Sequence, residues 1–86
     1  MNKTDITIYS TTTCSFCNAL KSWLDSQGVD YTYKVTDTDT DVMAEFMSVN
    51  DGMLGVPFTV IKSDNGEETK IVGLDKAKFK TALSLA

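Results

Sequence analysis

The spacing of the apolar residues changes at Cys14, and this change constrains the fold more than any other feature of the chain. Before it, residues 6–9 (Ile-Thr-Ile-Tyr) form a β-branched and aromatic run that predicts a strand. After it, apolar residues recur at i, i+3, i+4, i+7 and i+8, a spacing that predicts one buried face of a helix. Gly28 suits the end of that helix. The apolar positions of the helix are Phe16, Ala19, Leu20, Trp23 and Leu24.

The rest of the chain continues to alternate between strands and helices. The further predicted elements are a strand over 29–35, an acidic loop over 36–41 that caps the next helix, a helix from Val42 that ends at Asn50-Asp51-Gly52, a strand over 56–61, a hairpin turn at Ser63-Asp64-Asn65-Gly66, a strand to about Val72, and a helix from Leu74 to the end. The buried residues expected in the two later helices are Val42, Met43, Phe46 and Met47, then Phe79, Ala82, Leu83 and Ala86.

The predicted order β-α-β-α-β-β-α defines the fold class. A strand–helix–strand unit implies a right-handed parallel crossover, and a hairpin adds an antiparallel pair. The sequence therefore predicts an α/β fold in which helices flank both faces of a four-stranded mixed sheet. With 86 residues the chain has room for one domain, which we expect to span residues 1–86.

The composition excludes several classes of function. Histidine is absent, so Ser-His-Asp and Cys-His nucleophile systems and zinc sites built on histidine are excluded. All eight basic residues are lysines and the net charge is −4, so we expect neither nucleic acid nor a membrane surface as a partner. No apolar run approaches the roughly 18–20 residues of a membrane span, and no apolar leader precedes Ile6. We expect a cytoplasmic protein.

The two cysteines form Cys14-Ser15-Phe16-Cys17 at the predicted strand-to-helix junction. A thiolate in the first turn of a helix faces unpaired N–H groups and the positive end of the helix dipole, which lower its pKa. Cys17 lies one turn on, close enough to close a short disulfide. The pair thus predicts reversible two-electron redox chemistry. The alternatives are half of a zinc site completed by a dimer, unrelated core cysteines, and a structural disulfide.

Two other patterns are interpreted as structural. Asp37, Asp39 and Asp41 have the spacing that opens a calcium loop, but Val42 and Ser48 occupy the positions that need Gly and Glu. We interpret the segment as a solvated, helix-capping loop, and we expect no metal site. Other predicted structural roles are core packing for Met43 and Met47, a core anchor for Trp23, and a solvated face for Lys76, Lys78 and Lys80.

Four segments stand in an order and spacing typical of one family: Ile6-Thr7-Ile8-Tyr9, Thr13-Cys14-Ser15-Phe16-Cys17, Gly55-Val56-Pro57 and Val72-Gly73-Leu74-Asp75. With these segments the chain resembles the glutaredoxins, which have the thioredoxin fold, over nearly its whole length. The resemblance implies a cis Val56–Pro57 bond beside the cysteines. It also implies a glutathione site in which Val56 pairs with the peptide backbone, Phe16 flanks it, and Gly73, Leu74 and Asp75 hold the γ-glutamyl end.

The chain departs from the family pattern at several of these positions. Ser15 and Phe16 replace the Pro-Tyr of the usual Cys-Pro-Tyr-Cys motif. Many glutaredoxins have a lysine for the glycine carboxylate of glutathione where this chain has Thr11. Gly55 replaces the usual Thr or Arg before Val-Pro, and Lys76 replaces a second acidic residue. With a serine after the first cysteine, the chain also resembles glutaredoxins that hold a [2Fe–2S] cluster between two subunits.

The function that we expect is a glutathione-dependent thiol–disulfide oxidoreductase that reduces disulfides or glutathione mixed disulfides. Cys14 attacks and Cys17 resolves, and glutathione is a co-substrate, with no tightly bound cofactor. The partners are then glutathione and disulfide-containing or glutathionylated proteins, and the chain acts as a monomer. The alternatives are a thioredoxin-like electron donor, for instance to ribonucleotide reductase, recharged by a flavoprotein reductase, and a [2Fe–2S] cluster carrier.

Overall fold

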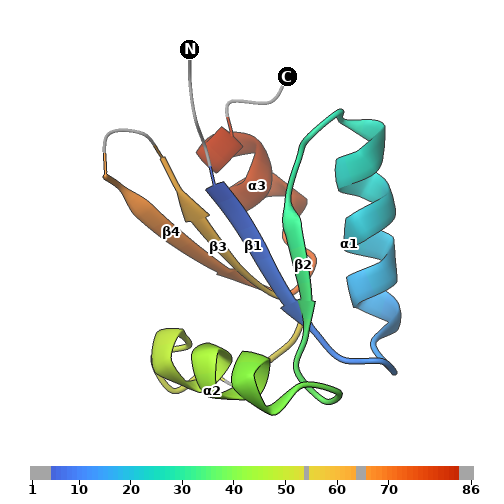
Figure 1. Cartoon of the computed structure of the whole chain (residues 1–86). Coiled ribbons are helices and arrows are strands. Elements are labelled where there is room, and N and C mark those ends of the chain that lie inside the picture. Colours follow the sequence, from blue (N-terminus) through green and yellow to red (C-terminus); the bar gives the residue numbers. More distant parts are fainter. Residues whose placement is uncertain (1–4, 54, 64–65, 84–86) are drawn as a thin grey trace.

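The strands and helices follow one another in the predicted order (Figure 1). The computed structural model describes residues 5–53, 55–63 and 66–83. Its elements are β1 (Asp5–Ser10), α1 (Ser15–Ser26), β2 (Thr32–Val35), α2 (Thr40–Val49), β3 (Phe58–Lys62), β4 (Glu68–Val72) and α3 (Lys76–Leu83).

The four strands form one mixed sheet in the order β2-β1-β3-β4. β2 runs parallel to β1, β3 runs antiparallel to β1, and β4 runs antiparallel to β3, so the predicted mixed sheet is confirmed. Ser10 pairs with Val35, Tyr9 pairs with Phe58, and Phe58 pairs with Val72. The C-terminal ends of β1, β2 and β4 therefore meet the start of β3 at one end of the sheet. We call this the lower end, as it lies in Figure 1.

Each face of the sheet packs against its own apolar cluster. Alternate residues of β1 separate the two clusters, since Ile8 belongs to one and Tyr9 to the other. The first cluster joins α1 and α3 to the sheet through Ile6, Ile8, Leu20, Leu24, Ile61, Ile71 and Phe79. The second joins α2 to the opposite face through Tyr9, Phe46, Phe58 and Val60. Helices thus cover both faces, as predicted.

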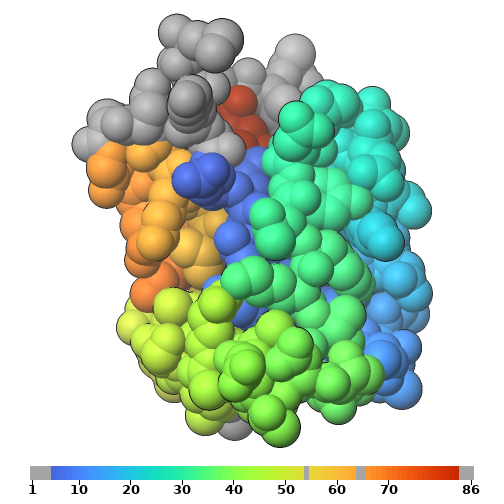
Figure 2. Space-filling model, in the orientation of Figure 1, coloured from blue at the N-terminus to red at the C-terminus, as the bar shows by residue number. Residues whose placement is uncertain are grey.

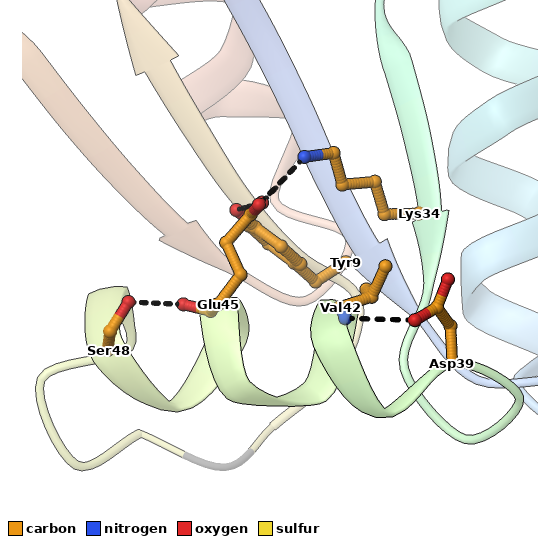
Figure 3. A network of polar contacts seen from close by, with 6 residues as sticks. All are labelled: Tyr9, Lys34, Asp39, Val42, Glu45 and Ser48. Carbon is orange, nitrogen blue, oxygen red and sulfur yellow. Dashed lines mark hydrogen bonds and ion pairs between the residues drawn. The ribbon is translucent and has the colours of Figure 1, made fainter.

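A polar network also joins α2 to the sheet (Figure 3). The hydroxyl of buried Tyr9 donates to Glu45, and Lys34 Nζ donates to both Glu45 oxygens at 2.7 and 3.0 Å. The helix itself begins where the Asp39 carboxylate accepts the Val42 N–H at 3.3 Å, the expected acidic cap. Glu45 therefore ties α2 to β1 and β2 together.

The predicted buried face of α1 is partly wrong. Leu20 and Leu24 are buried as expected, but Phe16 is 63% exposed and Ala19 is also exposed. The buried stripe instead begins with Cys17, which lies at i, i+3 and i+7 with the two leucines. Phe16 and Ala19 fall outside this narrower stripe because α1 covers only one edge of the sheet (Figure 1).

The predicted core role of Met43 and Met47 is wrong. These side chains are 38% and 54% exposed. Phe46 is buried, and Val42 and Val49 pack against the second cluster. The stripe that faces the sheet thus runs through i, i+4 and i+7, and both methionines lie one helical step outside it.

The ends of several elements differ from the predictions. β2 begins at Thr32 instead of Val29, and β3 begins at Phe58 instead of Val56, because the preceding Pro57 has no N–H for the ladder. α2 begins at Thr40 instead of Val42, and α3 at Lys76 instead of Leu74. The β3–β4 hairpin is confirmed, although residues 64–65 of its turn, like Ala86, lie outside the described residues.

Candidate active site

The two cysteines lie where the β1–α1 connection enters the helix, near the lower end of the sheet. Cys14 is the N-cap of α1, with extended backbone, and its Sγ accepts the Cys17 N–H at 3.0 Å. The two residues are joined as a disulfide with a Cα–Cα distance of 5.2 Å. Cys14 is partly exposed, whereas Cys17 is fully buried. A partner molecule therefore reaches the sulfur of Cys14 first.

The proline lies at the same end of the sheet, directly before the neighbouring strand β3. The Val56–Pro57 bond is cis, as predicted. Because Tyr9 pairs with Phe58, the register extends to place Pro57 beside Ser10, where β1 ends. The carbonyl of Pro57 accepts the Gly73 N–H at 2.7 Å, which joins the proline to the end of β4. Val56 is partly buried and packs against the second cluster.

The third predicted segment connects β4 to α3. Gly73 has a φ of +82°, a left-handed conformation that favours glycine, and it turns the chain away from the sheet. Leu74 packs against the first apolar cluster. Asp75 accepts the Lys78 N–H at 3.2 Å and so caps α3. Lys76 Nζ lies 5.8 Å from the centre of the Trp23 ring, so this cation is held over α1.

Two further predicted site residues flank the cysteines. Thr11 accepts the Cys14 N–H through its carbonyl at 3.4 Å, and its side chain is partly exposed. Phe16 lies between the two cysteines in sequence, and its side chain is exposed. At the end of β4, Val72 is 40% exposed. A Cβ added at Gly55 would lie 2.8 Å from Cγ1 of Val72. The absent side chain at residue 55 is what admits Val72 here.

Comparison with known proteins identifies this arrangement. The family model described as Glutaredoxin matches residues 6–68, which contain the cysteine pair and the cis proline. The chain belongs to the glutaredoxin family. This oxidoreductase therefore exchanges thiols and disulfides at the Cys14–Cys17 pair, and its fold is the thioredoxin fold. No curated protein sequence matches the chain significantly.

Solved structures agree on the fold. A glutaredoxin from Archaeoglobus fulgidus is 21% identical, with a TM-score of 0.72 over 91% of this chain and 84% of that one. Methanosarcina acetivorans methanoredoxin is 26% identical, with a TM-score of 0.75 over 92% and 83%. The glutaredoxin-like NrdH-redoxin from Escherichia coli, described as having a thioredoxin-like activity profile, is 21% identical, with a TM-score of 0.68 over 95% of both chains.

The structure adds one pair of residues that the sequence did not single out for this glutaredoxin site. Both oxygens of Asp37 accept the Thr12 N–H, at 3.1 and 3.2 Å, and Oδ2 also accepts the Thr12 hydroxyl at 2.7 Å. These hydrogen bonds hold the pKa of the Asp37 carboxyl below its usual value. The bond from the Thr12 hydroxyl has the larger effect, and the bond from the Thr12 amide the smaller. The two residues are 25 positions apart in sequence, so no local spacing signals their contact.

The charge of this end is mainly acidic. The parts of the connections that meet here are residues 11–14, 36–39, 55–57 and 73–75, and these parts carry Asp37, Asp39 and Asp75 but no lysine. The nearest lysine along the chain is Lys76, which lies over Trp23. A neutral or cationic partner is therefore met more favourably than an anion.

The described residues offer few donors for a metal. Among residues 5–53, 55–63 and 66–83, no three His, Cys, Asp or Glu side chains are grouped to hold a metal ion. Because Cys17 is buried and disulfide-bonded, Cys14 is the one cysteine that is partly exposed, so a [2Fe–2S] cluster would draw its remaining ligands from other molecules. No described helix is long and apolar enough to cross a membrane.

Proposed function

We propose that this glutaredoxin reduces disulfides by a dithiol mechanism in which Cys14 attacks, Cys17 resolves and glutathione is the reductant. The observation that supports these roles is the difference between the cysteines. Cys14 is partly exposed at the helix N-cap, where backbone N–H groups stabilise a thiolate, whereas Cys17 is fully buried. Burial disfavours ionisation of the Cys17 thiol, so Cys17 is the weaker candidate for the first attack.

The reaction proceeds through two exchanges. The Cys14 thiolate attacks one sulfur of a substrate disulfide, forms a mixed disulfide, and expels the other sulfur as a thiolate that takes a proton. Cys17 then loses its proton and attacks Cys14 Sγ, which releases the second substrate thiol and closes the Cys14–Cys17 disulfide. Two glutathione molecules restore the dithiol. The first forms a mixed disulfide, the second attacks its sulfur, and oxidised glutathione leaves.

Alkylation tests the assignment of the two cysteines. Reduced protein treated with iodoacetamide at mildly acidic pH should be labelled first at Cys14, because its thiolate is both exposed and stabilised. Mass spectrometry of the peptides identifies the labelled residue. Preferential labelling of Cys17 would reverse the two roles.

The glutathione site that we propose uses the segments around the cysteines. The backbone of Val56 pairs with the glutathione peptide, Phe16 flanks it, and the Gly73–Asp75 turn binds the γ-glutamyl end. At Thr11 the glycine carboxylate gains a neutral hydrogen bond of about 0.5–1.5 kcal/mol instead of a charge-assisted one of about 1.5–3 kcal/mol. The difference of about 1 kcal/mol predicts an affinity several-fold weaker than with a lysine there.

A coupled assay with glutathione, glutathione reductase and hydroxyethyl disulfide tests this site. Asp75→Asn keeps the oxygen that caps α3 but removes the charge, and it should raise KM for the glutathione mixed disulfide several-fold. Thr11→Lys should lower KM. Asp30→Asn removes the same charge beyond the other end of α1 and serves as the matched control. If Asp75→Asn and Thr11→Lys behave like this control, the glutathione site is elsewhere or absent.

A second function is favoured by the acidic lower end of the sheet. Asp37 and Asp39 repel an anionic tripeptide, whereas a reductase with a cationic docking surface would be attracted. The protein would then be a thioredoxin-like donor that a flavoprotein reductase recharges. The NrdH-redoxin neighbour is itself described as having a thioredoxin-like activity profile. Rapid reduction of the disulfide by NADPH and thioredoxin reductase, with slow reduction by glutathione, would select this function.

We further propose that the protein acts as a monomer in the cytoplasm on disulfide-containing or glutathionylated proteins. The support is the acidic composition and the Cys14–Cys17 pair, which needs no second chain to complete the dithiol. Light scattering after size-exclusion chromatography measures the oligomeric state. A dimer that dissociates on removal of iron would instead support the cluster-carrier alternative.

A further inference from the structure

Two connections at the lower end of the sheet are fastened to each other. One runs from the end of β1 to Cys14, and the other runs from the end of β2 to α2. Figure 2 shows the two segments side by side at the lower right of the molecular surface, in blue and in green. Thr12 gives Asp37 three hydrogen-bond contacts of 2.7–3.2 Å, through both its hydroxyl and its N–H.

The Asp37 side of this contact is anchored through the residue that precedes it. The residue before it, Thr36, is 3% exposed, and both its N–H and its hydroxyl donate to the Ser10 carbonyl, at 2.8 and 3.0 Å. Asp37 therefore leaves the sheet from a buried, doubly hydrogen-bonded residue. These bonds place the Asp37 backbone next to the end of β1.

The Thr12 side of the contact needs such support. Thr12 and Thr13 are exposed, so burial does not order this short connection. It ends at Cys14, whose N–H returns to Thr11 and whose Sγ accepts the Cys17 N–H. Contacts through Ser10 and Asp37 thus join residues 10–12, directly before Cys14, to the connection that follows β2.

We propose that Asp37 is a positioning residue that acts through Thr12 to hold Cys14 at the N-cap of α1, where the reduced sulfur is stabilised as a thiolate. This inference rests on the proposed role of Cys14 as the nucleophile. Asp37 does not touch the sulfur, and its hydrogen bonds, not its charge, carry the effect. The charge itself acts in the opposite direction, because a nearby carboxylate disfavours a thiolate.

A matched pair of variants separates these two effects. Asp37→Asn and Asp37→Ala both remove the negative charge, but the asparagine carbonyl still accepts hydrogen bonds from Thr12. Both are made with Cys17→Ser, so that Cys14 is the one thiol. The other ionisable groups on the connections around the site, Asp39 and Asp75, and the adjacent Lys76 are unchanged in both variants. Any difference between the two therefore reports the hydrogen bonds.

The measurement is the rate of iodoacetamide alkylation of Cys14 against pH. We expect the Asp37→Ala profile to lie about half a pH unit above the Asp37→Asn profile, or about threefold slower labelling on the acidic side. Thr12→Val, which loses the 2.7 Å hydroxyl contact but no charge, should shift in the same direction by less. Asp41→Ala and Asp41→Asn, from the same acidic segment, should coincide with each other.

Coincident profiles for Asp37→Ala and Asp37→Asn, together with an unshifted Thr12→Val, would overturn the proposal. Thermal unfolding of each variant is followed in parallel, and Thr12→Val remains a valid test if Asp37→Ala does not fold. No glutathione, reductase or substrate enters the experiment, so failure of the proposed reductant leaves its outcome unaffected. Absence of labelling at Cys14 in every variant would instead reject the nucleophile assignment.

Discussion

Removal of Glu45 should destabilise the fold through Tyr9 more than through Lys34. The Tyr9 side chain is only 4% exposed, and its hydroxyl donates to Glu45 (Figure 3). In Glu45→Ala that buried hydroxyl loses its acceptor, which costs roughly 1–3 kcal/mol. The ion pair with Lys34 joins side chains that are 32% and 40% exposed, so solvent screening limits its contribution to about 0.5 kcal/mol. The expected loss is about 2 kcal/mol in the free energy of unfolding.

A double-mutant cycle in urea separates these two contributions. In a Tyr9→Phe background the hydroxyl is gone, so Glu45→Ala should cost only about 0.5 kcal/mol, which leaves a coupling of about 1–2 kcal/mol. Glu45→Gln, which keeps an acceptor for the hydroxyl but lacks the charge, should lose less than Glu45→Ala. An equal cost of Glu45→Ala in both backgrounds would refute the argument that Tyr9 carries the effect.

The same network gives stability a defined dependence on pH. Hydrogen bonds from Lys34, then from Tyr9, hold the pKa of Glu45 below its usual value. A carboxyl with a lower pKa in the folded state stabilises fully above its unfolded pKa of about 4.3, and that contribution is lost as pH falls through the folded value. Burial, then Glu45, raises the pKa of Tyr9, so its contribution is lost as pH rises above about 10. The free energy of unfolding, measured in urea, should therefore fall less between pH 7 and pH 3 for Glu45→Ala than for the unchanged protein.

Further substitutions test the packing by urea unfolding. Met47→Gln should change the free energy of unfolding by less than about 0.5 kcal/mol, whereas Phe46→Ala on the buried stripe should cost roughly 3–5 kcal/mol. Similar losses for the two variants would mean that the Met47 side chain is buried. Gly55→Thr should cost roughly 1–3 kcal/mol through its contact with Val72, and much of that cost should vanish in a Val72→Ala background. Thr59→Val should stabilise by about 1 kcal/mol, because its buried hydroxyl has no hydrogen-bond partner among the described residues, and a loss would point to a partner for it.

Local patterns predicted the features of the fold that depend on neighbours in sequence. The strand before Cys14, the helix after it and the β3–β4 hairpin all follow from spacing and turn residues within short windows. These patterns do not predict whether an apolar residue beside the buried stripe of a helix faces the sheet or the solvent. Met43 and Met47 fit an apolar helix face by composition, but the sheet receives only the stripe of Val42, Phe46 and Val49. That choice depends on how α2 lies on the sheet, which is a tertiary property.

The same distinction holds for the candidate site. The cysteine pair is marked by its spacing at a strand-to-helix junction, whereas the cis bond before Pro57 was implied by the family resemblance, and the structure has both. The Thr12–Asp37 and Tyr9–Glu45 contacts join residues 25 and 36 positions apart, and threonine, aspartate, tyrosine and glutamate are common everywhere. Asp37 had been interpreted only as part of a capping loop, because its partner becomes adjacent only after the parallel pairing of β1 and β2.

At this site the topology of the sheet brings the reacting residues together, and the charges around them influence which electron donor binds. The parallel β1–β2 pair and the antiparallel β3 and β4 bring four connections to the lower end of the sheet whatever residues they carry. The first connection then carries the cysteine pair, and the third carries the proline. The choice of electron donor depends on the charges that the same connections carry, and here these are Asp37, Asp39 and Asp75, with Lys76 drawn over Trp23. Reversing one of these charges should therefore change which donor reduces Cys14 without changing the fold, whereas repacking the core should do the opposite.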